Sequence, residues 1–389
     1  MDYLKKGDQA MKNNKLSWAS MTALAFAIGA PSASAVDIQV AGDTTASIYG
    51  FARLNMAYNF DRAGPANETY FERVEKSNNE IGDQFRMAAN TSRLGFRTST
   101  PAAGSSIDTV FEFDFWDYDD ASNARLRLAS GSWNGILAGQ NWSNYTTFVA
   151  STPTVDFFGT AGSDGFGSRL NQLRYTTEGF SVALEAPQVQ LAPNADDSLE
   201  AHGNAVSSMP ALTLRYEDNI GDFSYSVAGV ARQLKYDTGN EKDTTMGYGG
   251  FVAGAYDIGP LTIRGLVNLS EGANSYLYLS GGLFNGADAY IDSNGNLQTL
   301  SGKGASVGLS YQISPHLAMN ATSGFTDVDP GDEAVGGNAD RVNRNAFLNL
   351  MWTPTDRLMY GVEYGYYETE LRGERGDASR IMVAAQYSF

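Results

Sequence analysis

Several residue types that build common enzyme sites are absent or rare in this chain of 389 residues. It contains no cysteine and only two histidines, His202 and His316. Disulfides and thiolate metal ligands are therefore excluded, and a histidine-based dyad or metal site has few residues to draw on. The sequence also has no P-loop, no dinucleotide-binding fingerprint and no HExxH motif. We therefore expect a protein that is not an enzyme and that holds no cofactor or metal.

Positive charge and long apolar runs are also scarce. The chain has 44 acidic and 27 basic residues, which gives a formal net charge of −17. This charge argues against nucleic acid or an anionic membrane surface as the main partner. The mean hydropathy of −0.29 argues against a bundle of membrane helices.

The one apolar run of helical length lies near the start of the sequence, in residues 11–35. Lys12 and Lys15 precede an apolar segment, 16–30, and small residues end the run at Ala35. This is the pattern of a cleaved secretory signal peptide. An amphipathic anchor helix is the alternative interpretation.

We expect translation to start at Met11, because the residues before it are charged and add nothing to a signal. Residues 1–35 would then hold the signal peptide together with an upstream extension. Residues 36–389 would form a single domain.

Beyond residue 35 the sequence shows alternation of period two and no strong helical period. The alternating segments are about ten residues long and rich in Tyr, Phe, Val and Gly. We identify sixteen of them: 47–60, 84–99, 106–118, 123–133, 135–142, 169–178, 180–190, 208–218, 222–236, 246–258, 261–270, 302–313, 316–327, 341–353, 356–369 and 379–389.

Long and short gaps alternate between these segments. The long gaps are 61–83, 143–168, 191–207, 271–301 and 328–340. Most of the others are tight turns such as Gly259-Pro260 and Ser314-Pro315. This pattern predicts an all-β fold: a sixteen-stranded antiparallel transmembrane β-barrel with short periplasmic turns and long external loops.

A large soluble β-sandwich would also show alternating strands. Two features disfavour it. Aromatic residues gather at the ends of the apolar faces, and long charged side chains occupy the middle of the opposite faces. In segment 47–60, for example, Ile48 and Tyr58 share one face while Arg53 and Asn55 share the other.

The stretch FEFDFWDY shows the same division of faces. Phe111, Phe113 and Phe115 alternate with Glu112 and Asp114. In a membrane barrel the phenylalanines face lipid or a neighbouring protomer, and the two acids face the lumen.

Arginines are concentrated on the polar faces of consecutive segments. An arginine on the lipid face near the bilayer midplane would cost roughly 2–4 kcal/mol, so these side chains should point into the lumen. In segment 123–133 we expect Leu126 and Leu128 to face outward. The predicted basic lumen residues are Arg53, Arg93, Arg97, Arg125, Arg127 and Arg174. Alternatively, they are ordinary lumen residues with no selective role.

The long gap 143–168 is aromatic and weakly charged. Phe148, Phe157 and Phe158 could pack against the barrel wall if this loop folds into the lumen. It would then narrow the lumen and place Asp156 opposite the arginines. Unequal charge at such a constriction sets ion preference.

The last strand, 379–389, places Ile381, Val383, Tyr387 and Phe389 on one face. A final strand of this kind resembles the C-terminal signal that the bacterial assembly machinery recognises in outer-membrane barrels. We therefore expect that machinery to be a partner, through Phe389.

Five stretches in this order resemble Gram-negative trimeric porins, and the DcaP-like porins in particular: SRLGFR, VFEFDF, ARLRLASGSW, LAGQNWSN and NQLRY. The resemblance is most specific over residues 47–187. It implies sixteen strands, a homotrimer, an inward-folded third loop and a preference for anionic solutes, dicarboxylates among them. By match to these motifs, the basic pore wall would comprise Arg93, Arg97, Arg125, Arg127 and Arg174, with Glu112 facing inward.

Two departures from the family pattern stand out. DcaP-like porins often carry a long coiled-coil segment after the signal, whereas here about ten residues separate Val36 from the first strand. The family's third loop has a Pro-Glu pair where this chain has Thr152-Pro153. A missing loop carboxylate would make the constriction more positive.

Together these observations predict an outer-membrane porin that passes small, anionic solutes by diffusion. Acidic residues such as Glu68 and Glu72 would lie in external loops, with outer-membrane lipid and lipopolysaccharide as neighbours. A non-selective diffusion porin, a barrel with a plugged lumen and an outer-membrane barrel enzyme are the alternatives.

Overall fold

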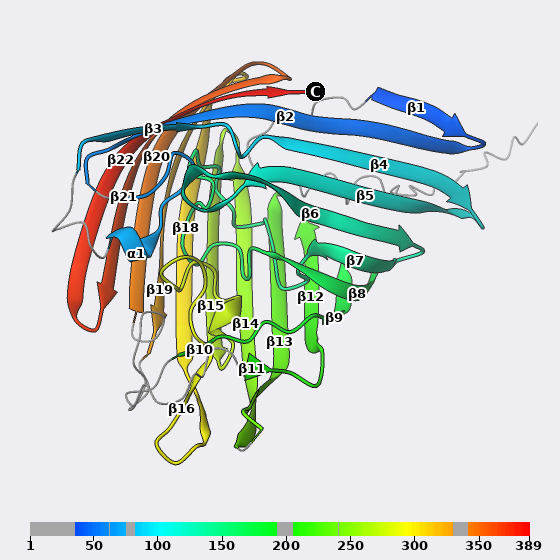
Figure 1. Cartoon of the computed structure of the whole chain (residues 1–389). Coiled ribbons are helices and arrows are strands. Elements are labelled where there is room, and N and C mark those ends of the chain that lie inside the picture. The colour runs from blue at the N-terminus through cyan, green and yellow to red at the C-terminus, as the bar shows by residue number, and fades with distance from the viewer. Residues whose placement is uncertain (1–35, 62, 75–81, 193–204, 240, 330–340) are drawn as a thin grey trace, which may run out of the picture.

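The computed structural model describes residues 36–61, 63–74, 82–192, 205–239, 241–329 and 341–389. In these ranges the chain forms a closed antiparallel barrel of sixteen strands (Figure 1). The predicted signal peptide 1–35, its start at Met11 and His202 all lie outside the described residues.

One strand in the first half of the barrel is interrupted. Its two parts, β3 and β4, lie end to end and both pair with β2. The elements of this half are β2 (Thr44–Asn59), β3 (Gln84–Ala88), β4 (Arg93–Ala102), β5 (Ser105–Trp116), β6 (Ser122–Trp133), β7 (Ile136–Trp142), β8 (Arg169–Thr177) and β9 (Phe180–Glu185). The second half consists of β12 (Ala211–Ile220), β13 (Phe223–Asp237), β14 (Lys242–Ile258), β15 (Leu261–Glu271), β18 (Ser301–Ser314), β19 (Leu317–Val328), β20 (Arg341–Thr355), β21 (Leu358–Leu371) and β22 (Glu374–Ser388).

The remaining elements are short. β1 (Val36–Ala41) forms a hairpin with the start of β2, and β11 (Ala205–Val206) pairs with β13. A small sheet of β10 (Leu191–Ala192), β16 (Ala289–Ile291) and β17 (Leu297–Thr299) joins two external loops. Within the described ranges the helical pieces are α1 (Phe71–Val74) and two 3₁₀ turns, Tyr118–Asp120 and Asn274–Tyr276.

The barrel closes where β22 pairs with β2, from Phe51 opposite Ser388 to Asn59 opposite Arg380. Phe389 and Gly50 extend this seam with a reciprocal pair of backbone hydrogen bonds of 3.0 and 3.1 Å. A Cβ at Gly50 would lie 2.2 Å from the carbonyl oxygen of Arg93, so only glycine fits there. Closure leaves no open edge among these strands, which a bilayer requires.

The sixteen predicted segments correspond one to one with the barrel strands. Turns at one rim are tight, and the left-handed backbone that such turns need is present at Asn134-Gly135 and Glu178-Gly179. The connections 143–168 and 272–300 at the other rim are long. The predicted alternation of short and long loops is therefore confirmed.

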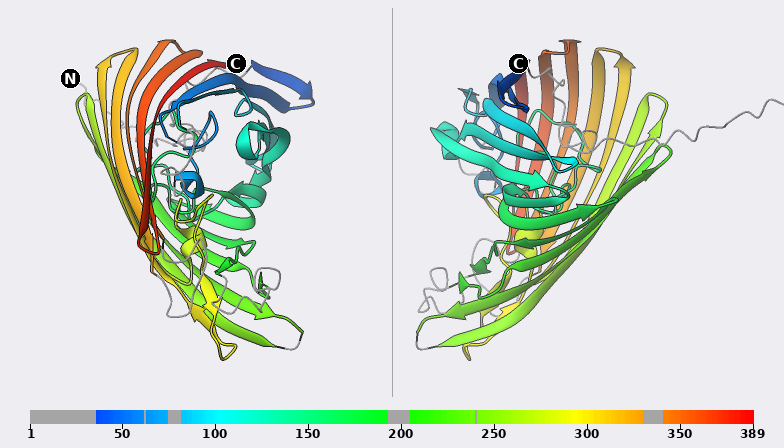
Figure 2. Two further views of the ribbon diagram at one scale, coloured as in Figure 1. Left: turned by 60° about the vertical axis from the view of Figure 1, so that its left-hand side comes forward. Right: turned by 90° about the vertical axis from the view of Figure 1, so that its right-hand side faces the viewer.

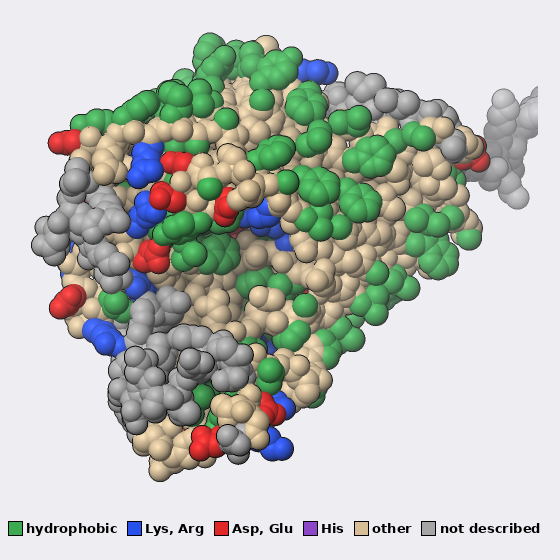
Figure 3. Space-filling view, in the orientation of Figure 1, with side chains coloured by type: hydrophobic (Ala, Val, Ile, Leu, Met, Phe, Trp, Pro, Cys, Tyr) green, Lys and Arg blue, Asp and Glu red, His purple; other side chains and the backbone are tan. Residues whose placement is uncertain are grey.

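The two faces of the wall also divide as predicted on β5. Phe111, Phe113 and Phe115 are exposed on the outside, whereas Glu112 and Asp114 are buried on the inside. Figure 3 shows the same division: hydrophobic side chains spread over the outer surface of the barrel, and charged side chains gather in the hollow of the visible face.

One face assignment is wrong. Leu128 was expected to face outward with Leu126, but it is buried and pairs with the inward residue Glu112. The register between β5 and β6 shifts at this point, because Phe113 pairs with Leu126 and Arg127 is left as an extra residue. A β-bulge of this kind turns two consecutive side chains to the same side.

Inward-folded loops lie inside the barrel (Figure 2). Residues of loop 60–74, loop 143–168 and loop 272–300 form one buried apolar cluster with the inner wall. Its members include Tyr70, Phe158, Tyr278, Phe347 and Tyr367. Over the described ranges, no helix is both long and apolar enough to cross a bilayer.

Candidate pore and its basic wall

The third loop at the loop-bearing rim, residues 143–168, lies inside the barrel against its second half. The Tyr145 hydroxyl donates to Asn268 of β15 at 2.7 Å. Thr160 and Thr322 of β19 exchange a hydrogen bond of 3.0 Å, and the Ala161 amide donates to Asn345 of β20 at 2.9 Å. The predicted inward fold of this loop is therefore confirmed. The loop also contacts the wall of β4–β8, where Phe148 packs against Trp142 and Phe158 against Trp116.

The tip of the loop is held by one carboxylate. Glu363, buried on β21, accepts hydrogen bonds of 2.8 Å from the backbone amides of Val155 and Asp156 and from the side chain of Asn349. From the seam strand β2, Arg53 donates to the carbonyl oxygen of Val155 at 2.7 Å. These contacts set how far the loop reaches across the lumen.

The opposite wall carries a group of charges that we call the basic wall. Its arginines extend from β4, β6 and β8, and its carboxylates, Glu112 and Asp114, extend from β5 between them. Arg169 on β8 lies near enough to Arg93, Arg125 and Arg127 to be repelled by their charges. The five arginines are Arg93, Arg97, Arg125, Arg127 and Arg169.

The two carboxylates, Glu112 and Asp114, link the arginines of neighbouring strands. Arg127 donates to Glu112 at 2.7 Å and to Asp114 at 2.9 Å. Arg125 donates two hydrogen bonds, of 2.8 and 2.6 Å, to the carboxylate of Asp114. The Nε atom of Arg93 lies 3.5 Å from Oε1 of Glu112. Paired geometry of this type fixes the guanidinium groups in direction as well as in place.

Aromatic rings support the guanidinium groups from the other side. Arg125 lies over Trp116 and Arg97 over Tyr49, each 4.3 Å from the ring centroid. Arg169 lies 4.7 Å from the centroid of Trp142. Cation–π contacts of this kind hold a cation without neutralising it.

The basic wall presents its positive groups to the lumen and covers its negative ones. Glu112 and Asp114 have almost no exposed surface, whereas the side chain of Arg125 is 27% exposed and that of Arg93 is 17% exposed. The wall holds five guanidinium groups and two carboxylates, and Arg93, Arg125 and Arg127 contact those carboxylates. The exposed surface of this wall is therefore cationic.

Arg174 does not join this wall. Its strongest charged neighbours are Arg215, Glu185 and Glu217, which lie around the base of the third loop. Arg215 donates to the carbonyl oxygen of Thr146 in that base. Arg215 was not predicted as an inward arginine, and Arg174 lies beside it and not in the basic wall, where it had been expected.

Asp156 is not on the surface of the lumen. It is 2% exposed, and its carboxylate accepts hydrogen bonds from the Tyr367 hydroxyl at 2.8 Å and from the amides of Phe158 and Gly159 at 2.9 and 3.1 Å. It therefore closes a turn within the loop, and the expected acidic side of the constriction is not formed by this residue.

Glu68 also differs from expectation. It is fully buried inside the barrel, in loop 60–74, instead of lying in solvent. Burial raises the pKa of Glu68 to about 8, although the Tyr70 hydroxyl donates a hydrogen bond to it at 2.7 Å. The Arg380 guanidinium on β22 donates to the carbonyl oxygens of Pro65 and Glu68 and so fixes this loop.

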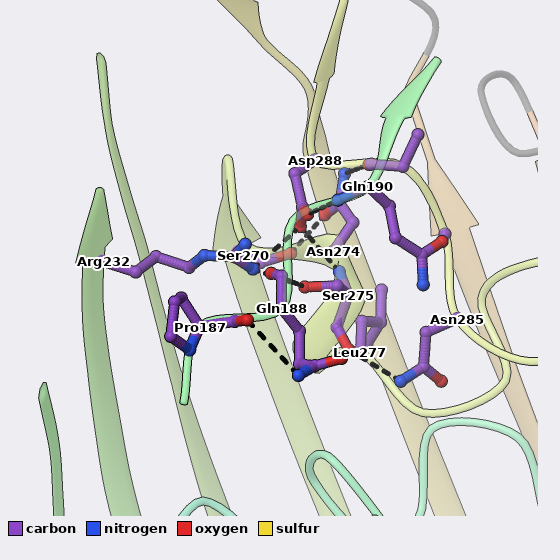
Figure 4. A network of polar contacts seen from close by, with 12 residues as sticks. Pro187, Gln188, Gln190, Arg232, Ser270, Asn274, Ser275, Leu277, Asn285 and Asp288 are labelled. Atoms are coloured by element: carbon purple, nitrogen blue, oxygen red, sulfur yellow. Dashed lines mark hydrogen bonds and ion pairs between the residues drawn. The ribbon is translucent and has the colours of Figure 1, made fainter. Parts of the chain in front are cut away.

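A third anchor holds the external loop 272–300. Asp288 accepts from the amides of Gln190 and Ser275, both at 2.8 Å, and pairs with Arg232 of β13 at 3.2 Å (Figure 4). Burial raises the pKa of Asp288 above its usual range. This network ties two external loops to the inner wall.

A closed sixteen-stranded barrel with an inward loop is the architecture of outer-membrane porins. The whole chain, residues 1–389, matches the family model described as DcaP outer membrane protein, and the protein belongs to that family of outer-membrane channels. No curated protein sequence is significantly similar to it.

Solved structures agree with this assignment. The outer membrane channel DcaP of Acinetobacter baumannii superposes with a TM-score of 0.78 at 25% identity, covering 90% of this chain and 99% of that one. OmpT of Vibrio cholerae reaches 0.57 at 15% identity, covering 90% and 100%. An anion-selective porin from Comamonas acidovorans reaches 0.57 at 12% identity, covering 89% and 100%. The last two show similarity of fold alone.

Replacing Glu112 by glutamine is expected to raise the anion-to-cation permeability ratio and to lower stability by about 1–3 kcal/mol. The substitution removes a negative charge from the basic wall. It also removes one of the carboxylates that pair with Arg127, whose side chain is 2% exposed. Reversal potentials in a salt gradient and thermal unfolding measure the two effects. Asp356→Asn, in an exposed turn, is the control. A fall in anion preference would contradict this role for Glu112.

Proposed function

We propose that this porin is a passive diffusion channel that favours small anionic solutes, dicarboxylates among them. The observation that supports this most is the basic wall, where partly exposed guanidinium groups extend inside the barrel while their carboxylate partners are covered. Anions would be concentrated beside the wall, and cations would be depleted there.

The acidic composition of the whole chain does not oppose this proposal. At physiological ionic strength the Debye length is about 8 Å, so carboxylates in distant external regions are screened from the constriction. The local charge of the wall then decides which ions enter. A dicarboxylate could engage two neighbouring guanidinium groups in turn as it passes.

The test is the reversal potential of single channels in a KCl gradient. In the Arg93→Ala, Arg125→Ala double variant we expect the anion-to-cation permeability ratio to fall about fivefold, which corresponds to ~1 kcal/mol. Arg357→Ala, in the exposed tight turn between β20 and β21, serves as the control. Cation preference in the unmodified channel, unchanged in the double variant, would favour a non-selective diffusion porin instead.

The solute class needs a second measurement. Current blockade by a panel of monocarboxylates and dicarboxylates of equal length separates charge from size. Stronger blockade by the dicarboxylates is expected, and it should weaken in the Arg93→Ala, Arg125→Ala variant. Equal blockade by both classes would remove dicarboxylates from the proposal.

We further propose the following about assembly. The protein would be exported by a signal peptide cleaved after Ala35, recognised by the outer-membrane assembly machinery through Phe389, and assembled as a homotrimer. A trimer form is described for Vibrio cholerae OmpT, which shares this fold. Crosslinking of the purified protein in detergent tests the oligomeric state.

A further inference from the structure

Loop 60–74 carries a carboxyl group that is buried and has no cationic partner. Glu68 has no exposed surface, and its Oε1 atom accepts a hydrogen bond of 2.7 Å from the Tyr70 hydroxyl. Its Oε2 atom is buried without a hydrogen-bond partner. Among the described residues no basic side chain forms an ion pair with this carboxyl, because Arg380 donates instead to the backbone carbonyl oxygen of Glu68.

Glu68 lies where loop 60–74 meets the third loop. The Phe157 amide donates a hydrogen bond of 2.8 Å to the carbonyl oxygen of Asn67, the residue before Glu68. Two residues after Glu68, the ring of Tyr70 packs on that of Phe158, with centroids 5.9 Å apart. A displacement of Glu68 would therefore disturb the packing of both loops inside the barrel.

Trp116, at the end of β5, connects Glu68 to the basic wall. Its indole Nε1 is buried without a hydrogen bond of regular geometry, and it lies near enough to the Glu68 carboxyl to favour the ionised form. Arg125 lies over the same indole, 4.3 Å from the ring centroid. The position of loop 60–74 therefore affects a ring that supports a partly exposed cation of the basic wall.

The groups around Glu68 do not compensate for ionisation of its carboxyl. Asp156, on the third loop, is a second buried carboxylate, and its charge opposes ionisation of Glu68. Arg380, on β22, attracts an ionised Glu68 from a distance, and Tyr70 and Trp116 favour the ionised form through their N–H and O–H groups. Desolvation by burial outweighs these effects and raises the pKa of Glu68 to about 8.

Two further charged residues of the loop face the connection between β5 and β6. Arg73 pairs with Asp119 at 3.0 Å, and Glu72 accepts a hydrogen bond of 2.7 Å from the Tyr118 hydroxyl. Unlike Glu68, Glu72 is partly exposed. The same loop therefore offers a matched carboxylate in a polar setting.

We propose that Glu68 is a positioning residue of the channel and that its protonation controls the conductance. The neutral carboxyl keeps loop 60–74 packed against Trp116 and the third loop. Ionisation places an uncompensated charge in this packing, loosens the loop and widens the path for small solutes. The proposal rests on the channel function of the family and not on the anion preference of the basic wall.

The direction of the effect follows from the environment of Glu68. Its pKa of about 8 lies above the usual glutamate value of about 4.3. The packed loop is therefore most stable below about pH 4, and this stabilisation is lost as the pH rises toward about 8. Within this window, each pH unit lowers the ratio of packed to loosened loop by up to about tenfold.

Single-channel conductance of the purified full chain, measured from about pH 5 to about pH 9, tests the proposal. The conductance of the unmodified channel should rise with pH. Glu68→Gln keeps an acceptor for the Tyr70 hydroxyl but cannot ionise, so this variant should stay at the low conductance throughout. Glu72→Gln is the control and should follow the unmodified pH profile. A conductance of the unmodified channel that does not change with pH would overturn the proposal.

Two more variants separate Glu68 from its neighbours. Trp116→Phe keeps an aromatic ring beside Arg125 but removes the indole N–H that favours ionised Glu68, so the rise in conductance should move to higher pH. Asp156→Asn should keep the pH dependence. If Asp156→Asn abolished it while Glu68→Gln retained it, Asp156 would be the controlling group and the proposal would be wrong.

The unfolding temperature across the same pH range is a second readout. It should fall more steeply with rising pH in the unmodified protein than in Glu68→Gln, because only the former buries an ionisable carboxyl at this position. A merely structural role for Glu68 would change stability equally at every pH, and that result would contradict the proposal. Reversal potentials report the solute preference separately, so a channel controlled by Glu68 but without anion preference would reject the proposed solute class alone.

Discussion

Replacing Glu363 by alanine is expected to release the tip of the third loop and to enlarge the channel. Glu363 accepts three hydrogen bonds of 2.8 Å, two of them from the backbone of the loop. Hydrogen bonds to a charged acceptor contribute about 1.5–3 kcal/mol each, so losing the two to the loop removes at least ~3 kcal/mol. That loss corresponds to a change of more than a hundredfold in the population of the anchored loop.

Single-channel conductance and the size limit for sugars in liposome swelling both measure this release, and both should increase. Glu374→Ala, in an exposed position at the loop-bearing rim, is the matched control. Glu363→Gln should give an intermediate result, since the amide keeps one acceptor oxygen. If the alanine variant kept the original conductance and size limit, the carboxylate would not be what holds the loop.

Replacing Phe113 by arginine is expected to prevent assembly in the outer membrane. Phe113 is exposed on the apolar outer face, between Phe111 and Phe115 and beside Leu94 and Leu126 on the neighbouring strands. A charged side chain on the lipid face costs roughly 2–4 kcal/mol near the bilayer midplane, which is a large part of the 5–15 kcal/mol that stabilises a typical fold. The same cost arises if this face packs against a neighbouring protomer.

The amount of folded protein in outer-membrane fractions, scored by its heat-modifiable mobility in gel electrophoresis, measures the effect. Phe113→Leu keeps an apolar side chain and should assemble normally. If the arginine variant had the same yield and gel mobility as the unmodified protein, Phe113 would not face an apolar environment.

The wall of the barrel was predictable because it depends on a local pattern. Alternation of period two decides which side chains of a strand face outward, and membrane and lumen demand opposite chemistry. The outward or inward direction of each residue from Phe111 to Phe115 could therefore be predicted from this short sequence alone. The face of Leu128 could not be assigned in this way. The β-bulge beside it arises from the pairing of two strands, and the alternation within a single strand does not reveal it.

The contents of the barrel were harder to predict, because they depend on contacts between residues far apart in the chain. Asp156 was expected at a constriction, yet it binds Tyr367, 211 positions away. The inward position of loop 60–74 was missed, although Tyr70 and Phe71 are the same signal that predicted an inward third loop. Arg174 was grouped with the arginines of the preceding strands by match to the porin motifs, whereas its charged neighbours are Arg215, Glu185 and Glu217 at the loop base.

The two strands that meet at the seam each hold one of the inward loops. Arg53 on β2 binds the third loop at Val155, and Arg380 on β22 binds loop 60–74 at Pro65 and Glu68. Arg380 itself pairs with Asn59 across the seam. A barrel closed around empty space would leave both guanidinium groups without these partners, so insertion of the loops and joining of the seam are thermodynamically coupled. The completed ring is therefore stabilised by the loops that it encloses, and weakening either arginine contact should also weaken the seam.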